Sequence, residues 1–318
     1  MNEYLNEVKE SSYKRYSELK SKIEAAYSGK KEFENACVFA CGSMGRLDMT
    51  TGSDLDLFFI ENNDEKNKIS DLNKHLFFAD LYKINDEMCF EKPSRNGAFW
   101  IFTQKQHLLD IGSQVEDFNN SFTARLLLLL ESKPLFNDEL YNKLIEETVN
   151  KYFYAYDDNQ DCFLPLFMMN DILRYWYTLT LNYEFRRDSN DNPDKKYWKR
   201  LKLKFARLIT CYSLYLCLYE PDISPEYTID CIKMTPLERL ESISQKIPQT
   251  LETVLEIEKE YEWYLELRKQ GPEWWSENGN KEMAFERADK FHNLVTHELT
   301  TRVASFNKRL SEKTELNC

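Results

Sequence analysis

Residues 36–60 read ACVFACGSMGRLDMTTGSDLDLFFI, and this stretch decides the fold. Ala36–Ala40 is a short apolar run typical of a buried strand, and it stops at Gly42 and Ser43. A polar loop is expected next. Asp54–Ile60 alternates acidic and apolar residues and then becomes wholly apolar, as a strand does when it enters a core. The sequence therefore predicts two strands, with polar residues where the first ends and the second begins.

The residues around these two strands give the rest of the architecture. Residues 2–28 and 64–88 repeat apolar positions at helical spacing, and Phe99–Thr103 is a third plausible strand. The remaining chain is helical in character almost to its end. We therefore expect an α+β fold, with a small mixed-sheet domain over residues 1–138 and a larger all-helical domain over residues 139–318.

The composition narrows the class of protein. The 318 residues include 42 Lys+Arg and 54 Asp+Glu, which gives a formal net charge of −12. Because phosphate binding depends on surplus Lys and Arg, this balance excludes nonspecific coating of nucleic acid but leaves room for a local basic groove. Only 8 Gly against 19 Tyr and 20 Phe favours a helix-rich structure packed with aromatic side chains.

The sequence indicates a cytoplasmic protein that does not insert into a membrane. The N-terminus lacks the basic-then-apolar order of a signal peptide, and the apolar run at Leu208–Tyr219 is too short to span a bilayer. The 8 cysteines form no CxxC pair and no Cys/His cluster, so zinc is not indicated and a reduced, small-hydrophobe role is expected.

Two carboxylates and a glycine–serine pair carry the chemistry. Asp54 and Asp56 are separated by one residue, so on a strand they leave the same face, where they repel each other unless a cation lies between them. Such oxygen ligands suit Mg²⁺, which also binds substrate phosphates. Gly42 and Ser43 offer backbone N–H groups and a hydroxyl to a phosphate. Alone, DxD is typical of a solvated strand end and GS of a turn; together they predict a metal–triphosphate site.

The motifs G-S-x-G-R and S-D-L-D-L resemble the DNA polymerase beta-type nucleotidyltransferase superfamily, nearest to the branch of the PII-protein uridylyltransferases and stand-alone relatives. The resemblance covers about residues 36–61. It implies a small mixed sheet flanked by helices, and a C-terminal helical domain that closes the nucleotide cleft. It also implies transfer of a nucleoside monophosphate from an NTP or dNTP, with release of pyrophosphate.

Matched by position, the resemblance implies that Gly42 and Ser43 bind the triphosphate. It implies that Asp54 and Asp56 are catalytic and ligate Mg²⁺, with two ions expected and Mn²⁺ as a substitute. Ser53 orders the intervening loop and is counted with the nucleotide-binding residues.

Arg46 fills the basic position of the motif. A phosphate contact and a structural pairing with Asp48 or with backbone carbonyls are equally good interpretations of this arginine.

The superfamily usually has a third carboxylate on a later strand, and its position here is open. The expected strand at Phe99–Thr103 carries no acid. Glu91 is the best candidate by order along the chain, although a solvated loop acid fits it equally well. The alternatives are Asp86, Glu87 and Asp110.

The helical domain has one basic segment, Lys195–Arg207, in an otherwise acidic chain. Lys199 and Lys202 are candidate nucleotide-binding residues within it, and Tyr197 and Trp198 are available for base stacking. A solvated basic face is an equally good interpretation.

Two arginines lie in strongly apolar helical segments. Arg125 and Arg174 are expected to be buried and therefore to need anionic partners. Asp171 and Glu184 are available to Arg174, and Glu131 and Glu116 lie near Arg125 in sequence.

The leading hypothesis is thus a Mg²⁺-dependent nucleotidyltransferase. Its hydroxyl acceptor is a protein side chain, a nucleic-acid or oligonucleotide end, or a small molecule, and a protein partner is compatible with it. Stress response and phage defence are compatible settings by analogy only. The alternative is a catalytically inactive nucleotide-binding sensor or partner protein of the same fold.

Overall fold

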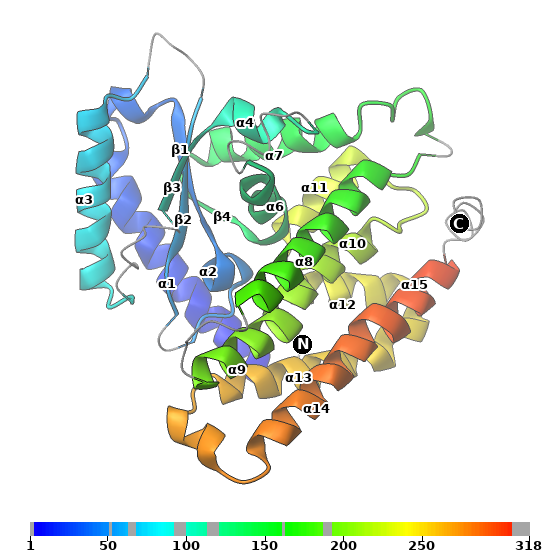
Figure 1. Cartoon of the computed structure of the whole chain (residues 1–318). Helices are drawn as coiled ribbons and strands as arrows, with labels where there is room; N and C mark the ends of the chain where they lie inside the picture. Colours follow the sequence, from blue (N-terminus) through cyan, green and yellow to red (C-terminus); the bar gives the residue numbers. More distant parts are fainter. Residues whose placement is uncertain are drawn as a thin grey trace. The chain divides into compact units, whose positions relative to one another are not determined.

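The computed structural model describes residues 3–50, 53–62, 68–91, 100–112, 121–160, 163–186 and 193–306. The chain divides into two compact units (Figure 1). The sheet unit comprises Asn6–Lys151, and the helical unit comprises Tyr152–Cys318 together with Met1–Leu5. The predicted α+β class is confirmed, because a small mixed sheet in the N-terminal region is followed by helices.

The sheet has four strands in the order β3-β2-β1-β4. β1 runs antiparallel to both β2 and β4, whereas β2 and β3 are parallel. The first three strands lie close to the predicted positions. The bounds are β1 (Ala36–Cys41), β2 (Asp56–Glu61), β3 (Trp100–Gln104) and β4 (Lys133–Phe136).

Helices cover both faces of the sheet, which explains why β1 and β2 are buried along their whole length. On one face, Val38 and Phe59 share a core with apolar residues of α1 (Glu3–Tyr27) and α3 (Asp71–Glu87). On the other face, Phe39 stacks on Phe58 at 5.2 Å and its ring lies 5.9 Å from that of Tyr141. The covering helices there are α6 (Ser121–Glu131) and α7 (Asp138–Tyr152).

Two details of the sheet unit differ from the expectation. β4 is an additional strand, and its Pro134 is tolerated because β4 is an edge strand. The residues after β1 form a short helix, α2 (Gly42–Arg46), where a loop was expected. α7 belongs to the same compact unit as the sheet, and its Tyr141 hydroxyl donates to the Ser132 carbonyl at 3.2 Å. The shorter helical pieces are η1 (Lys31–Phe33) and α4 (Lys105–Leu109).

The helical unit is built around aromatic and arginine side chains. Phe205 stacks on Tyr264 at 4.8 Å and lies 4.6 Å from Phe291. The fully buried Arg239 donates to the carbonyls of Cys231 at 2.8 Å and Ile232 at 3.1 Å. The α-helices are α8 (Leu166–Arg186), α9 (Pro193–Lys202), α10 (Leu208–Cys217), α11 (Pro225–Lys233), α12 (Pro236–Lys246), α13 (Leu251–Leu267), α14 (Asn280–Asn293) and α15 (Thr300–Phe306).

Two π-helical segments interrupt the long helices of this unit. They are η4 (Leu203–Arg207), between α9 and α10, and η7 (Leu294–Leu299), between α14 and α15. The remaining short pieces are the 3₁₀ helices η5 (Pro248–Thr250) and η6 (Pro272–Ser276). Among the described residues, none of these helices combines the length and apolar character needed to cross a bilayer.

Candidate functional site

The predicted glycine–serine pair and one of the predicted acids, Asp56, meet where β1 ends and β2 begins. Cys41, the last residue of β1, pairs with Asp56, the first residue of β2. α2 starts at Gly42, directly after this pair. Antiparallel pairing thus brings Gly42 and Asp56 together, although they are distant in sequence.

Gly42 is required at its position for two physical reasons. Its φ is +67°, a left-handed conformation that residues with a side chain rarely adopt. A Cβ atom built on Gly42 would lie 2.6 Å from Oδ2 of Asp56, closer than real Cβ contacts. The absence of a side chain therefore lets the backbone approach the Asp56 carboxylate.

Ser43 follows with a hydroxyl that has no hydrogen-bond partner. The residue is only 8% exposed, and its Oγ is among the buried polar atoms left unsatisfied in the described part of the chain. Such a group costs free energy unless a ligand or water satisfies it. Asp56, 7% exposed, belongs to the same strand junction. The junction therefore combines a backbone cradle, a hydroxyl and a buried carboxylate.

Asp54 lies outside the strand. It precedes β2 and is exposed, whereas the predicted strand began at this residue. The described residues contain no group of three or more His, Cys, Asp or Glu side chains able to hold a metal ion. The two acids that were expected to share one face therefore differ in burial, since Asp54 is exposed and Asp56 is 7% exposed.

Glu91 does not complete a three-carboxylate site in the described part of the chain. It is exposed and follows α3, where its carbonyl accepts a hydrogen bond from Nδ2 of Asn85 at 3.3 Å. β3 runs parallel to β2, with Trp100 opposite Leu57. The preceding residues 92–99 read KPSRNGAF and lie outside the described residues, but their sequence contains no acid.

The alternatives to Glu91 also do not form a metal-binding group among the described residues. Asp86 and Glu87 end α3, and Glu87 pairs with Lys22 at 2.9 Å. Asp110 follows α4 and accepts a hydrogen bond from Gln106 at 2.7 Å.

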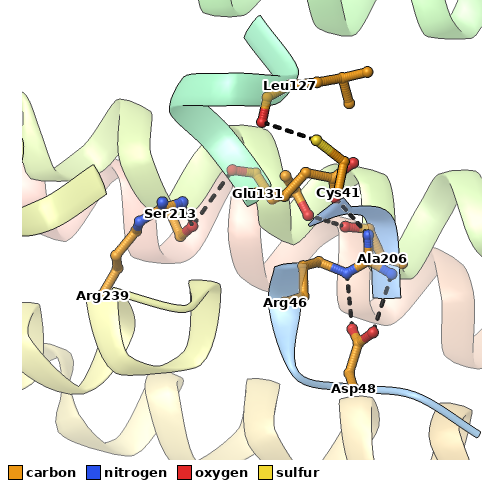
Figure 2. A network of polar contacts seen from close by, with 9 residues as sticks. Cys41, Arg46, Asp48, Leu127, Glu131, Ala206, Ser213 and Arg239 are labelled. Atoms are coloured by element: carbon orange, nitrogen blue, oxygen red, sulfur yellow. Dashed lines mark hydrogen bonds and ion pairs between the residues drawn. The ribbon is translucent and has the colours of Figure 1, made fainter. Parts of the chain in front are cut away.

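Arg46 has a structural role (Figure 2). Its Nε donates to Asp48 at 2.8 Å, a second nitrogen donates to the same carboxylate at 3.1 Å, and the remaining nitrogen pairs with Glu131. All three side chains are buried. Of the two interpretations of Arg46, the structure thus shows the pairing with Asp48, with Glu131 of α6 as an additional partner.

Glu131 is the residue that sequence reasoning did not connect to Arg46. It is the single acid of a mostly apolar helix, and a buried lone acid needs a cationic partner. Gly45 lies beside the same helix, since a Cβ atom there would be 1.9 Å from the Glu131 carbonyl oxygen. α2 is therefore fixed against α6 by an ion pair and by close backbone contact.

Ser53 orders the loop before β2, as the sequence predicted. Its Oγ accepts a hydrogen bond from the Thr50 backbone N–H at 2.9 Å, and its own N–H donates to the Thr50 carbonyl at 3.0 Å. Residues 51 and 52 lie outside the described residues.

Cys37 of β1 has a buried and unreactive thiol. Burial raises the pKa of Cys37 to about 12, with a smaller opposing effect of Lys105. The thiol is therefore protonated at neutral pH and is a poor nucleophile.

The remaining candidates belong to the helical unit or to other parts of the sheet unit. Lys199 and Lys202 are exposed on α9 of the helical unit. Tyr197 and Trp198 pack on Trp275, each with a ring separation of 5.2 Å.

The two apolar-helix arginines differ from each other. Arg174 was expected to be buried, but its side chain is 43% exposed. It pairs with Asp171 at 3.6 Å, and Asp171 was one of its two expected partners. Arg125 is fully buried as expected and donates to the Leu108 carbonyl at 3.4 Å.

Comparison with known proteins adds no family assignment. The chain matches no protein-family model, and no curated protein matches it significantly.

Proposed function

We propose that the protein is a Mg²⁺-dependent nucleotidyltransferase that moves a nucleoside monophosphate from an NTP or dNTP to a hydroxyl acceptor. The observation that carries this proposal is the junction of β1, α2 and β2, where the Gly42 backbone approaches Asp56 and the Ser43 hydroxyl is buried without a partner. The resemblance of these motifs to the DNA polymerase beta-type superfamily supports it.

Electrostatics explains why these groups suit a metal-bound triphosphate. A phosphate held by the Gly42–Ser43 backbone lies beside the Asp56 carboxylate, and two such anions repel each other in a partly buried site. A divalent cation ligated by Asp54 and Asp56 removes this repulsion, and when bound it stabilises charge on the reacting phosphate and the leaving pyrophosphate.

The chain's own residues provide binding and orientation. The Ser43 hydroxyl donates to a phosphate oxygen, and the backbone N–H groups that open α2 do the same. Arg46 supports the phosphate-binding turn indirectly, because its ion pairs with Asp48 and Glu131 hold α2 in place. The in-line geometry of the displacement therefore depends on a turn fixed by buried charges.

The acceptor we propose is a protein side chain or a nucleic-acid or oligonucleotide end, with the cytoplasm as the setting. The six cysteines in the described part of the chain form no disulfide with one another, which is compatible with that setting. A catalytically inactive nucleotide sensor is the second candidate. It is favoured by one observation, the lack of any acid in β3 and in residues 92–99 before it.

Pyrophosphate release tests the proposal. The purified chain is incubated with each labelled NTP and dNTP, with Mg²⁺ or Mn²⁺, and with a lysate as acceptor source. Asp56→Asn is expected to lower release at least about 100-fold. Asp138→Asn is the control, because this exposed acid of the same unit pairs with Lys20 and is not at the junction. Migration of the label with protein, polynucleotide or small molecules identifies the acceptor.

Two outcomes would count against the enzyme. Release that persists in the Asp54→Asn/Asp56→Asn double variant contradicts the site. Nucleotide binding without release, under every acceptor condition, replaces the transferase with the sensor.

A further inference from the structure

The helical unit contains a cavity that is lined only by its own residues. Its volume is about 450 Å³, within the range of small-molecule sites. It is lined by residues of α8, of α9 with the following η4 segment, and of α14. The lining residues are Trp176, Tyr177, Thr180, Tyr183, Glu184, Arg200, Leu203, Lys204 and His292.

Arg200 is the cation of this cavity that is open to a ligand. Its guanidinium lies 4.0 Å from the ring centroid of Phe285, and among the described residues it has no carboxylate or hydrogen-bond partner. Stacking fixes the plane of the guanidinium and leaves its N–H edge available for an anion. Lys204, in contrast, is 3.7 Å from Asp289.

The other titratable side chains limit how much negative charge the cavity accepts. His292 contributes no positive charge at neutral pH, because burial lowers its pKa and the nearby Lys204 and His297 lower it further. Glu184 adds a carboxylate to the lining. One anionic group therefore fits at Arg200, whereas a chain of phosphates would meet repulsion.

An exposed aromatic ring lies in the same lining. Tyr177 is 62% exposed, and no other ring packs on it in the described part of the chain. A free tyrosine face stacks well on a planar ring. The wall also includes Leu203 and Lys204 of a π-helical segment, a rare geometry that is frequent at functional sites.

We propose that this cavity binds a nucleoside monophosphate, with the phosphate on Arg200 and the base on Tyr177. The cavity belongs to a different compact unit from the proposed transferase site, and it differs from that site in two properties. It needs no divalent cation, and it prefers a monophosphate to a triphosphate.

Calorimetric titration of the full chain tests the proposal. The probes are AMP, GMP, CMP and UMP, with ATP, adenosine and ribose 5-phosphate for comparison, all in EDTA. We expect one of the monophosphates to bind, and the matching triphosphate, nucleoside or sugar phosphate to bind at least about tenfold more weakly. Asp54→Asn/Asp56→Asn is expected to leave this binding unchanged.

Variants of the lining assign the binding to the cavity. Arg200→Met is expected to weaken it about 10–100-fold, through loss of a charged hydrogen bond. Tyr177→Ala, at an exposed position that does not endanger folding, is expected to weaken it at least about 5-fold. Arg174→Met is the control, because Arg174 is on α8 but does not line the cavity.

Three results would overturn the proposal. The first is no binding of any monophosphate at millimolar concentration. The second is binding that Asp54→Asn/Asp56→Asn abolishes and Arg200→Met leaves intact, which moves the ligand to the sheet unit. The third is equal affinity for AMP and ribose 5-phosphate, which would mean that the cavity does not recognise the base.

Discussion

Arg46 in the sheet unit and Arg200 in the helical unit use the same side chain in opposite ways. Arg46 is 4% exposed, and its guanidinium is saturated by Asp48 and Glu131. Arg200 is partly exposed and is held by the Phe285 ring alone among the described residues. The difference teaches that an arginine near a phosphate motif is not thereby a phosphate ligand. What matters is which of its donors remain open.

The largest expected effect is the loss of stability on removing Arg46, and the removal of Arg200 is the comparison. Arg46→Met leaves the carboxylates of Asp48 and Glu131 buried without their cation, so the free energy of unfolding should fall by about 3–5 kcal/mol. Arg200→Met removes a cation–π contact and should cost about 1 kcal/mol or less. Urea unfolding of both variants measures the contrast. Equal losses of stability would erase the distinction between the two arginines.

Glycine substitutions sharpen the contrast at the Gly42 turn. Gly42→Ala and Gly29→Ala both place a side chain at positive φ, which costs roughly 1–2 kcal/mol. At Gly29 a new Cβ atom meets nothing within 4 Å, whereas at Gly42 it meets Asp56. We expect Gly42→Ala to lose more stability and also to lose nucleotide transfer. Thermal unfolding and pyrophosphate release measure the two effects.

Gly29→Ala is the control for this prediction. If Gly29→Ala and Gly42→Ala lose equal stability and both retain transfer, the close approach of Gly42 to Asp56 has no functional meaning.

The smallest expected effect separates a ligand-binding hydroxyl from a structural one. Ser43→Ala should change stability by less than about 0.5 kcal/mol, because its Oγ makes no hydrogen bond, but should weaken triphosphate binding. Ser132→Ala should cost about 1 kcal/mol, since its Oγ donates to the Leu128 carbonyl at 2.6 Å. Chemical unfolding and nucleotide titration decide this. A large stability loss in Ser43→Ala would mean that the hydroxyl is structural, like that of Ser132.

Local pattern was enough to predict much of the sheet unit. The apolar runs at β1 and β2 carry the signal of strands buried on both faces, and the sequence also places Gly42 and Asp56 at their ends. β4 escaped prediction because it is four residues long, contains Pro134, and is defined by pairing with a distant strand. α2 is too short for periodicity to reveal.

Contacts between distant residues explain what the sequence left open. Arg46 finds Glu131 only when α6 packs against α2, so its role was undecidable from the motif alone. Arg174 lies on an outer face of α8 together with exposed apolar residues, and composition alone made that face look buried. The cavity at Arg200 is lined by residues of α8, α9 and α14, so no local sequence pattern predicts it.

The central claim is that the junction of Gly42, Ser43 and Asp56 holds a triphosphate together with Mg²⁺. Titration of a non-hydrolysable NTP analogue, with and without Mg²⁺, tests it independently of turnover. The account predicts that the wild-type chain binds the analogue at least about tenfold more tightly with Mg²⁺, and that Asp56→Asn loses this enhancement. Equal affinity with and without Mg²⁺, or an enhancement that survives in Asp56→Asn, would contradict it.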